Sequence, residues 1–129
     1  MLPAIAMAAA LAVAGTPALA KVDGEASLAR MLDGRVAGQP VDCIPLSVHG
    51  GSNLTVVDGV GIVYRIGDTI YVNRTANPRI LDWDDVLVLE PATGSQLCRH
   101  DQVYTHDRGG LARTGVVFLE QFVPYKRAG

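Results

Sequence analysis

Turn signals at regular intervals limit the fold of this chain more than any other feature. They recur along the sequence between short apolar runs, and stand at Gly50-Gly51, Asp58-Gly59, Gly67-Asp68, Asn77-Pro78, Thr93-Gly94 and Gly109-Gly110. Short runs divided in this way are typical of an all-β meander or barrel. We therefore expect a mainly β fold, either a small antiparallel sheet or a partly closed barrel of about six to seven strands, with one short N-terminal helix.

The composition favours strands once the segment before Lys21 is set apart, because that segment is almost entirely apolar. From Lys21 onward, Val and Ile together number 20, whereas Ala, Glu and Lys together number 12. β-Branched residues are enriched in strands. The chain from Lys21 to Gly129 is too short for a second domain of normal size or for a doubly wound dinucleotide-binding fold.

The segment 1–20 has the pattern of an export signal. Positions 4–14 are an unbroken run of Ala, Ile, Met, Leu and Val, and Ala18-Leu19-Ala20 precedes Lys21 as an A-x-A cleavage site. The run is shorter than the roughly 20 apolar residues of a membrane-spanning helix. We expect a signal peptide over residues 1–20, a periplasmic or secreted product, and no stable membrane span after cleavage. No Lys or Arg precedes the run, so a start upstream of Met1 stays open.

Cys43 and Cys98 are the two cysteines of the chain. An exported protein meets an oxidising compartment, where such a pair usually forms a disulfide. Neither cysteine has a second Cys or His at C-x-x-C spacing, although His100 follows Cys98 by two positions, so a metal pair or a reactive thiol is the weaker alternative. We predict a disulfide that joins the first strand to a late one.

The predicted organisation has three parts after the signal. Residues 21–42 form a short helix and a connecting loop, because Leu28, Met31 and Leu32 follow helical spacing and Gly34 is placed as a stop. Residues 43–125 form the β domain, and residues 126–129 form a basic tail.

The clearest predicted strands form a hairpin around Gly67-Asp68, in which Tyr64 is opposite Tyr71 and Val63 is opposite Val72. The run of residues 86–89 is apolar without alternation, which predicts a strand buried on both faces at the centre of the sheet. Residues 96–106 and 116–123 supply two further strands.

Two imidazole–carboxylate pairs, His100-Asp101 and His106-Asp107, are the most suggestive chemical pattern. These groups are usual metal ligands and acid–base catalysts. In a straight strand, however, about 20 Å separates the two histidines, so they share one metal only if a turn brings them together. We expect a polar strand end and loop.

Other charged groups point to no established site. Asp82, Asp84 and Asp85 suggest Ca²⁺, but the EF-hand glycine is missing, and we expect a solvated turn with Trp83 packed inward. The nine arginines and two lysines are spread along a chain of net charge −2, which gives no nucleic-acid footprint. Asn53-Leu54-Thr55 and Asn73-Arg74-Thr75 match the glycosylation pattern, to which we assign no modification.

Several segments carry a resemblance to a known family, namely residues 34–46 (GRVAGQPVDCIPL), 57–59 (VDG), 71–74 (YVNR), 94–99 (GSQLCR) and 122–125 (FVPY). In these segments, which extend over about residues 30 to 125, the chain resembles uncharacterised short exported proteins of sphingomonads and related Alphaproteobacteria. The resemblance implies a bacterial envelope context and structural roles for both cysteines, and it implies no catalytic residues. Residues 101–114, which contain the aspartates of both histidine–aspartate pairs, depart from the family pattern.

The leading hypothesis is thus a non-enzymatic structural or binding module of the cell envelope, without a cofactor or metal, whose candidate partner is another envelope protein. The alternative is a small periplasmic metal-binding or hydrolytic protein that uses His100, Asp101, His106 and Asp107. A partner-binding protein needs an exposed apolar patch or a free strand edge, which the sequence does not locate.

Overall fold

The computed structural model describes residues 23–46, 53–109 and 112–128, so the predicted signal peptide lies outside the described residues. One helix, α1 (Gly24–Met31), and one 3₁₀ turn, η3 (Pro78–Ile80), accompany ten strands in this part of the chain. The strands are β1 (Arg35–Ala37), β2 (Cys43–Pro45), β3 (Leu54–Val57), β4 (Gly61–Ile66), β5 (Thr69–Asn73), β6 (Val86–Glu90), β7 (Gln96–Cys98), β8 (Gln102–His106), β9 (Arg113–Val117) and β10 (Val123–Arg127). The expected mainly β fold with one short helix is confirmed.

The strands form three antiparallel sheets. Five strands pair in the order β1-β10-β5-β4-β3, three pair in the order β6-β8-β9, and β2 pairs with β7. Two apolar clusters lie on opposite sides of the five-stranded sheet. One of them, built around Ile62, Tyr64, Val103 and Phe122, fills the space between the sheets.

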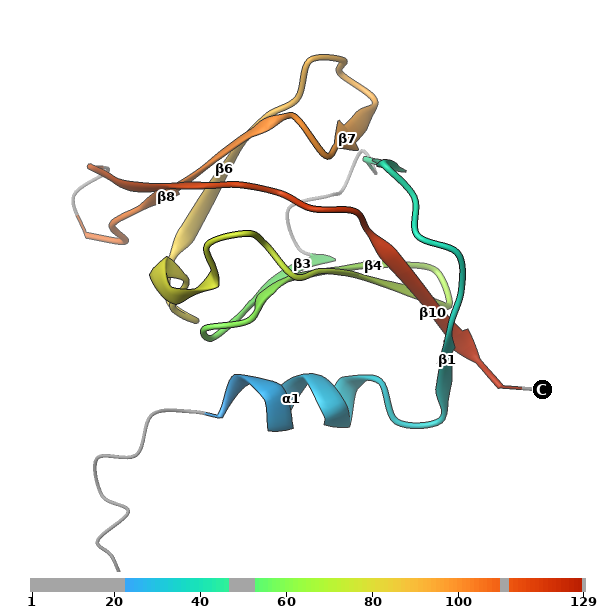
Figure 1. Ribbon diagram of the computed structural model, residues 1–129. Coiled ribbons are helices and arrows are strands. Elements are labelled where there is room, and N and C mark those ends of the chain that lie inside the picture. Colours follow the sequence, from blue (N-terminus) through green and yellow to red (C-terminus); the bar gives the residue numbers. More distant parts are fainter. Residues whose placement is uncertain (1–22, 47–52, 110–111, 129) are drawn as a thin grey trace, which may run out of the picture.

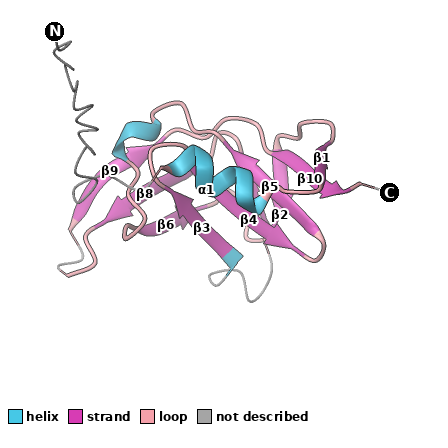
Figure 2. Cartoon of the chain, turned by 90° about the horizontal axis from the view of Figure 1, so that it is seen from below, coloured by secondary structure: helices cyan, strands magenta, loops and turns pink. Residues whose placement is uncertain are grey.

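The second cluster lies between the five-stranded sheet and α1, which crosses the outer face of that sheet (Figures 1 and 2). Asp23 begins the helix, where its side chain accepts a hydrogen bond from the N–H of Ala26 at 3.2 Å. Leu28 is buried against the sheet, and Gly34 follows the helix with a φ of 74°. The helix predicted before Gly34 is therefore confirmed.

The β4–β5 hairpin has the predicted register. Tyr64 pairs with Tyr71 and Val63 pairs with Val72, and Gly67 in the turn has a φ of 57°. Alternation sends Tyr64 into the cluster between the sheets and Val63 into the cluster under α1. The expectation that both faces of this hairpin are covered is confirmed.

Several predicted strands are divided differently in the structure. The run over 96–106 is interrupted by a turn and forms β7 and β8, and the run over 116–123 forms the end of β9 and the start of β10. β1 lies within the predicted connecting loop, and β10 continues through Lys126 and Arg127 of the predicted tail. These two residues pair with Val36 and Arg35 of β1, which explains why the strand is longer than its apolar part.

Two asparagine side chains, one at the end of β5 and one just before η3, join this part of the chain to the end of β9 and the segment that follows it. Asn73 is fully buried; it donates to the carbonyl of Glu120 at 2.7 Å and accepts from the N–H of the same residue at 2.9 Å. Asn77 makes an equivalent pair of bonds to the carbonyl of Val116 and the N–H of Phe118, at 2.7 and 3.0 Å. The bonds of Asn77 occupy backbone groups at the end of β9. These groups lie on the side of β9 that faces away from β8.

Candidate functional site

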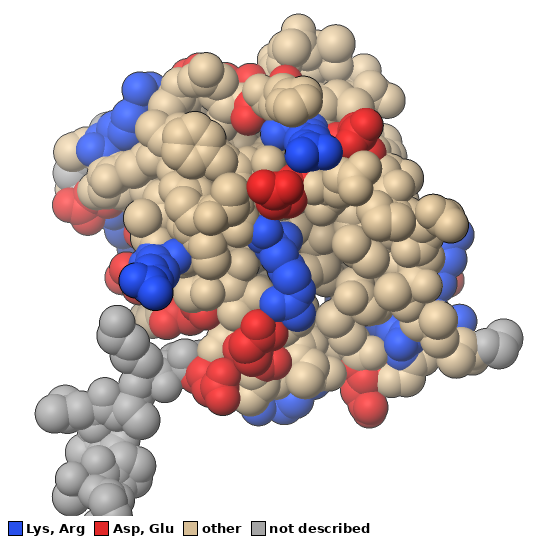
Figure 3. All heavy atoms as spheres, in the orientation of Figure 1, with Lys and Arg blue, Asp and Glu red and all other residues tan. Residues whose placement is uncertain are grey.

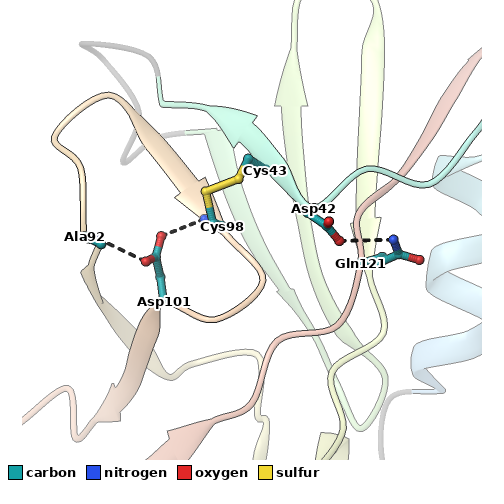
Figure 4. Close-up of a disulfide and its surroundings, with 6 residues drawn as sticks. All are labelled: Asp42, Cys43, Ala92, Cys98, Asp101 and Gln121. Carbon is teal, nitrogen blue, oxygen red and sulfur yellow. Dashed lines mark hydrogen bonds between the residues drawn. A yellow bond between two sulfur atoms is a disulfide. The ribbon is translucent and has the colours of Figure 1, made fainter.

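The cysteines form the predicted disulfide across the β2–β7 pair (Figure 4). Cys43 and Cys98 are directly opposite each other, with their Cα atoms 4.0 Å apart. The neighbouring pair is hydrogen-bonded, because Arg99 N–H donates to the Asp42 carbonyl at 2.7 Å. The cysteines therefore occupy a non-hydrogen-bonded position, where opposing side chains are closest.

Asp101 supports the β7 loop rather than facing a histidine. Its carboxylate accepts from the N–H of Cys98 at 2.7 Å and from the N–H of Ala92 at 3.0 Å (Figure 4). A carboxylate that accepts two backbone hydrogen bonds fixes the loop that carries the disulfide.

The structure does not bring the two histidine–aspartate pairs together. His100 and Asp101 precede β8, and His106 and Asp107 stand at its far end. His100 and Asp101 line a cavity of about 170 Å³ with residues 116–119, whereas Asp107 lines a separate cavity beside the acidic residues of 82–85. No group of three His, Cys, Asp or Glu ligands in the described residues includes either histidine.

The prediction that residues 86–89 form a central, doubly buried strand is wrong. β6 stands at the edge of its sheet, next to β8 alone, and Val86 is 38% exposed. Leu87 and Leu89 face the core, while Val86 and Val88 lie on the opposite face beside His106 and Tyr104. An apolar run without alternation does not distinguish a central strand from an edge strand whose outer face is also apolar.

Alternation along the strands shows which backbone groups of β6 point away from β8. The N–H of Asp107 donates toward β9, to the carbonyl of Ala112, so the backbone of His106 one residue earlier points toward β6. His106 pairs with Val86, so the N–H and carbonyl groups of Val86 point toward β8. The orientation alternates along a strand, so the N–H and carbonyl groups of Val88 point toward β8 as well. The backbone groups of Leu87 and Leu89 therefore lie along the free side of β6, which we call the β6 edge. No described residue pairs with it.

Carboxylates gather where β3 ends and β6 begins. We call Asp58, Asp82, Asp84 and Asp85 the acidic corner. The N–H of Trp83 donates to Asp58 Oδ1 at 2.7 Å, and the N–H of Gly59 donates to the Leu81 carbonyl at 3.1 Å, which holds the two strand ends together. Carboxylate oxygens of Asp82, Asp84 and Asp85 lie within 4.8 Å of one another, in an arrangement able to hold a hard cation or basic groups of a partner.

The crowding of carboxylates changes the pKa of Asp85. Burial raises the pKa of its carboxyl above the ordinary value, and the surrounding negative charges of the acidic corner raise it further. The N–H of Asp82, which donates to Asp85 Oδ2 at 2.8 Å, acts in the opposite direction on the pKa. Arg79 and Arg108 line the two cavities that flank the corner, but its carboxylates outnumber these two guanidinium groups.

Trp83 projects from the acidic corner and is 66% exposed, so the prediction that it packs inward is wrong. The turn at residues 82–85 is held by hydrogen bonds of backbone and carboxylate groups, so it does not need a buried tryptophan. Leu81, just before the turn, is the residue that packs into the core. An exposed tryptophan beside carboxylates can contact both apolar and cationic groups of a partner. Figure 3 shows charges of both signs interspersed on the face that it draws.

The sequence carries only weak signals for the bonds of Asn73 and the exposure of Trp83. For Asn73 the only signal was its place in a hairpin strand, where a buried amide must find partners. For Trp83 the flanking aspartates on both sides were a signal of exposure, because an inward tryptophan at that position would draw charged neighbours toward the core.

No protein-family model, curated protein or solved structure matches the chain. Among the residues that the structure describes, none of the helices is long and apolar enough to span a membrane.

Proposed function

We propose that this protein is an exported, non-enzymatic binding module of the cell envelope, and that the β6 edge with Trp83 is its contact surface. The observation that carries the proposal is the combination of a five-residue edge strand, apolar in its first four residues, with an exposed tryptophan three residues before it. Soluble domains usually protect such edges with Lys, Pro, a bulge or a covering loop. Within the described residues, β6 has none of these along its length, and its one charged residue, Glu90, lies at its C-terminal end.

The other exposed edges are less suited to binding. β1, β2 and β7 have three residues each, and β3 has four, with Thr55 exposed between its apolar residues. β9 begins with Arg113 and ends where Asn77 occupies its backbone groups. The β6 edge is therefore the strand edge in the described structure that combines length, apolar character and free backbone groups.

Three further observations support export and an envelope role. The disulfide fits an oxidising compartment. The segment before Lys21 has the signal pattern, and the resemblance to short exported proteins agrees with it. Removal of residues 1–20 would produce a mature chain that begins at Lys21, which intact-mass measurement of envelope and culture fractions tests directly.

A photo-reactive amino acid in place of Trp83 tests the contact surface. In cells, illumination should produce a discrete adduct from position 83 and none from the control position Val36, which is 58% exposed but lies on β1. The proposal fails if position 83 produces no adduct, or if both positions produce the same one.

The alternative metal-binding or hydrolytic function predicts a different result. Zn²⁺ should then raise the melting temperature of the purified protein and EDTA should lower it. The separation of His100 from His106 along β8 supports our proposal instead, under which neither reagent changes the melting temperature by binding at these residues.

A further inference from the structure

We propose that the occupant of the β6 edge is an extended peptide segment of a partner protein, added as an antiparallel strand, with alternating apolar residues and a basic C-terminal end. This inference rests on the proposed function and specifies its partner. The backbone, the side chains and the charges around β6 each support one part of it.

The backbone requires an extended partner. Leu87 and Leu89 present their N–H and carbonyl groups to the β6 edge, and a peptide strand satisfies such groups by β-augmentation. All strand pairs of the three sheets are antiparallel, so an added strand that follows the same pattern is antiparallel to β6.

The side chains require apolar residues in the partner. Leu87 and Leu89 on β6 are only half-buried although they pack against the core cluster between the sheets. The same holds for Leu54 and Val56 of β3, which is the edge of the five-stranded sheet. Figure 2 shows β3 and β6 on the same side of the molecule. A strand added to β6 covers part of this apolar surface with its inward residues.

The charges determine the polarity of the partner. The acidic corner adjoins the N-terminal end of β6, and in an antiparallel arrangement the C-terminal end of the added strand lies there. Lysine or arginine at that end meets the carboxylates and the ring of Trp83. A second copy of this chain fits poorly, because self-pairing about Val88 would place Glu90 of each copy near Val86 and the acidic corner of the other.

Peptide binding to the full mature protein tests the inference. The probe is a short peptide of alternating valine and threonine that ends in two lysines, measured by calorimetry or fluorescence of Trp83. Two control peptides differ in one respect each: one ends in two glutamates, and one carries N-methyl groups on the backbone amides that would pair with β6. We expect binding of the lysine-ended peptide, with affinity at least about tenfold weaker for each control.

A charge exchange on the protein supplies the matching control. Asp82 and Asp84 are exposed, and their side chains hold no part of the turn, so Asp82→Lys with Asp84→Lys should leave the fold intact, as circular dichroism verifies. The double variant should lose about tenfold in affinity for the lysine-ended peptide and recover affinity for the glutamate-ended one.

Three results would overturn the inference: lack of binding by the lysine-ended peptide, equal binding by the N-methylated peptide, or a concentration-dependent dimer that Val86→Lys abolishes. The proposed function is tested separately. If the adduct at position 83 forms but the peptide fails to bind, the contact surface stands and the basic strand is wrong. If neither occurs, the surface itself is wrong.

Discussion

The side-chain amide of Asn73 pairs with the backbone of Glu120 as a neighbouring strand would, donating to its carbonyl at 2.7 Å and accepting from its N–H at 2.9 Å. Asn73 is fully buried, so these bonds join the end of β5 to the chain that leaves β9 where no water replaces them. β9 is the strand at the other end of the three-stranded sheet from β6, so these bonds hold the end of that sheet that lies away from the β6 edge.

Loss of the Asn73 amide should therefore destabilise the protein. Asn73→Ala leaves backbone groups of Glu120 without their partner, and we expect a loss of about 2–4 kcal/mol in the free energy of unfolding. Asn77→Ala removes an equivalent pair of bonds at a half-buried position and should cost less. Urea denaturation of both variants measures the difference; equal losses would contradict the role of burial.

The disulfide should contribute a large share of the stability. Cys43 and Cys98 close a loop with a sequence separation of 55, for which the chain-entropy model predicts about 4 kcal/mol. The Cys43→Ala/Cys98→Ala double variant should lose about that amount at equilibrium, and a reducing agent should destabilise the native protein but not the variant. An unchanged free energy of unfolding after reduction would contradict this expectation.

Substitution of Asp101 tests whether this residue supports the loop or belongs to a catalytic pair with His100. Because its carboxylate accepts from Cys98 and Ala92, Asp101→Ala should lower the free energy of unfolding by about 1–3 kcal/mol. His100→Ala, one residue earlier, should change it by under about 0.5 kcal/mol. Thermal and urea unfolding of the two variants make the comparison, and a neutral Asp101→Ala would refute the loop-supporting role.

The pH dependence should reveal the crowding at Asp85. Its folded-state pKa is raised above the unfolded value, so the folded protein holds the proton more strongly and ionisation weakens folding. This unfavourable contribution grows as pH rises from the ordinary value of 3.8 through the raised pKa, and is complete above it.

Asp85→Asn retains an oxygen that accepts from the N–H of Asp82 and removes the charge. We expect the variant to be more stable than the parent at pH 7 by under about 1 kcal/mol, with the difference vanishing below about pH 3. Asp33→Asn, outside the acidic corner, is the control. The measurement is the difference in the free energy of unfolding between Asp85→Asn and the parent. If the variant were less favoured at pH 7 than at pH 3, the predicted direction of the Asp85 effect would be wrong.

The sequence predicted those parts of the fold in which local signals agree with tertiary structure. Helical spacing before Gly34 and the turn at Gly67 are local, and the register of Tyr64 with Tyr71 follows from the turn. The pairing of the two cysteines followed from their number and from the expected compartment.

The candidate site was not predictable in the same way, because it depends on which strands lack a neighbour. β6 has the most apolar sequence of the late strands, yet its position at the sheet edge depends on pairing between segments distant in sequence. Periodicity reports which residues are apolar and does not report whether a second strand is present beside them. The exposure of Trp83 follows from the same arrangement, since the turn that carries it lies at the sheet edge.

Amide hydrogen exchange along β6 in the purified mature protein tests the central claim most directly. The account predicts that the N–H groups of Leu87 and Leu89, which lie on the β6 edge, exchange much faster than that of Val88, which points toward β8. Slow exchange at all three positions would show that the β6 edge is already paired, and would contradict its role as a binding surface.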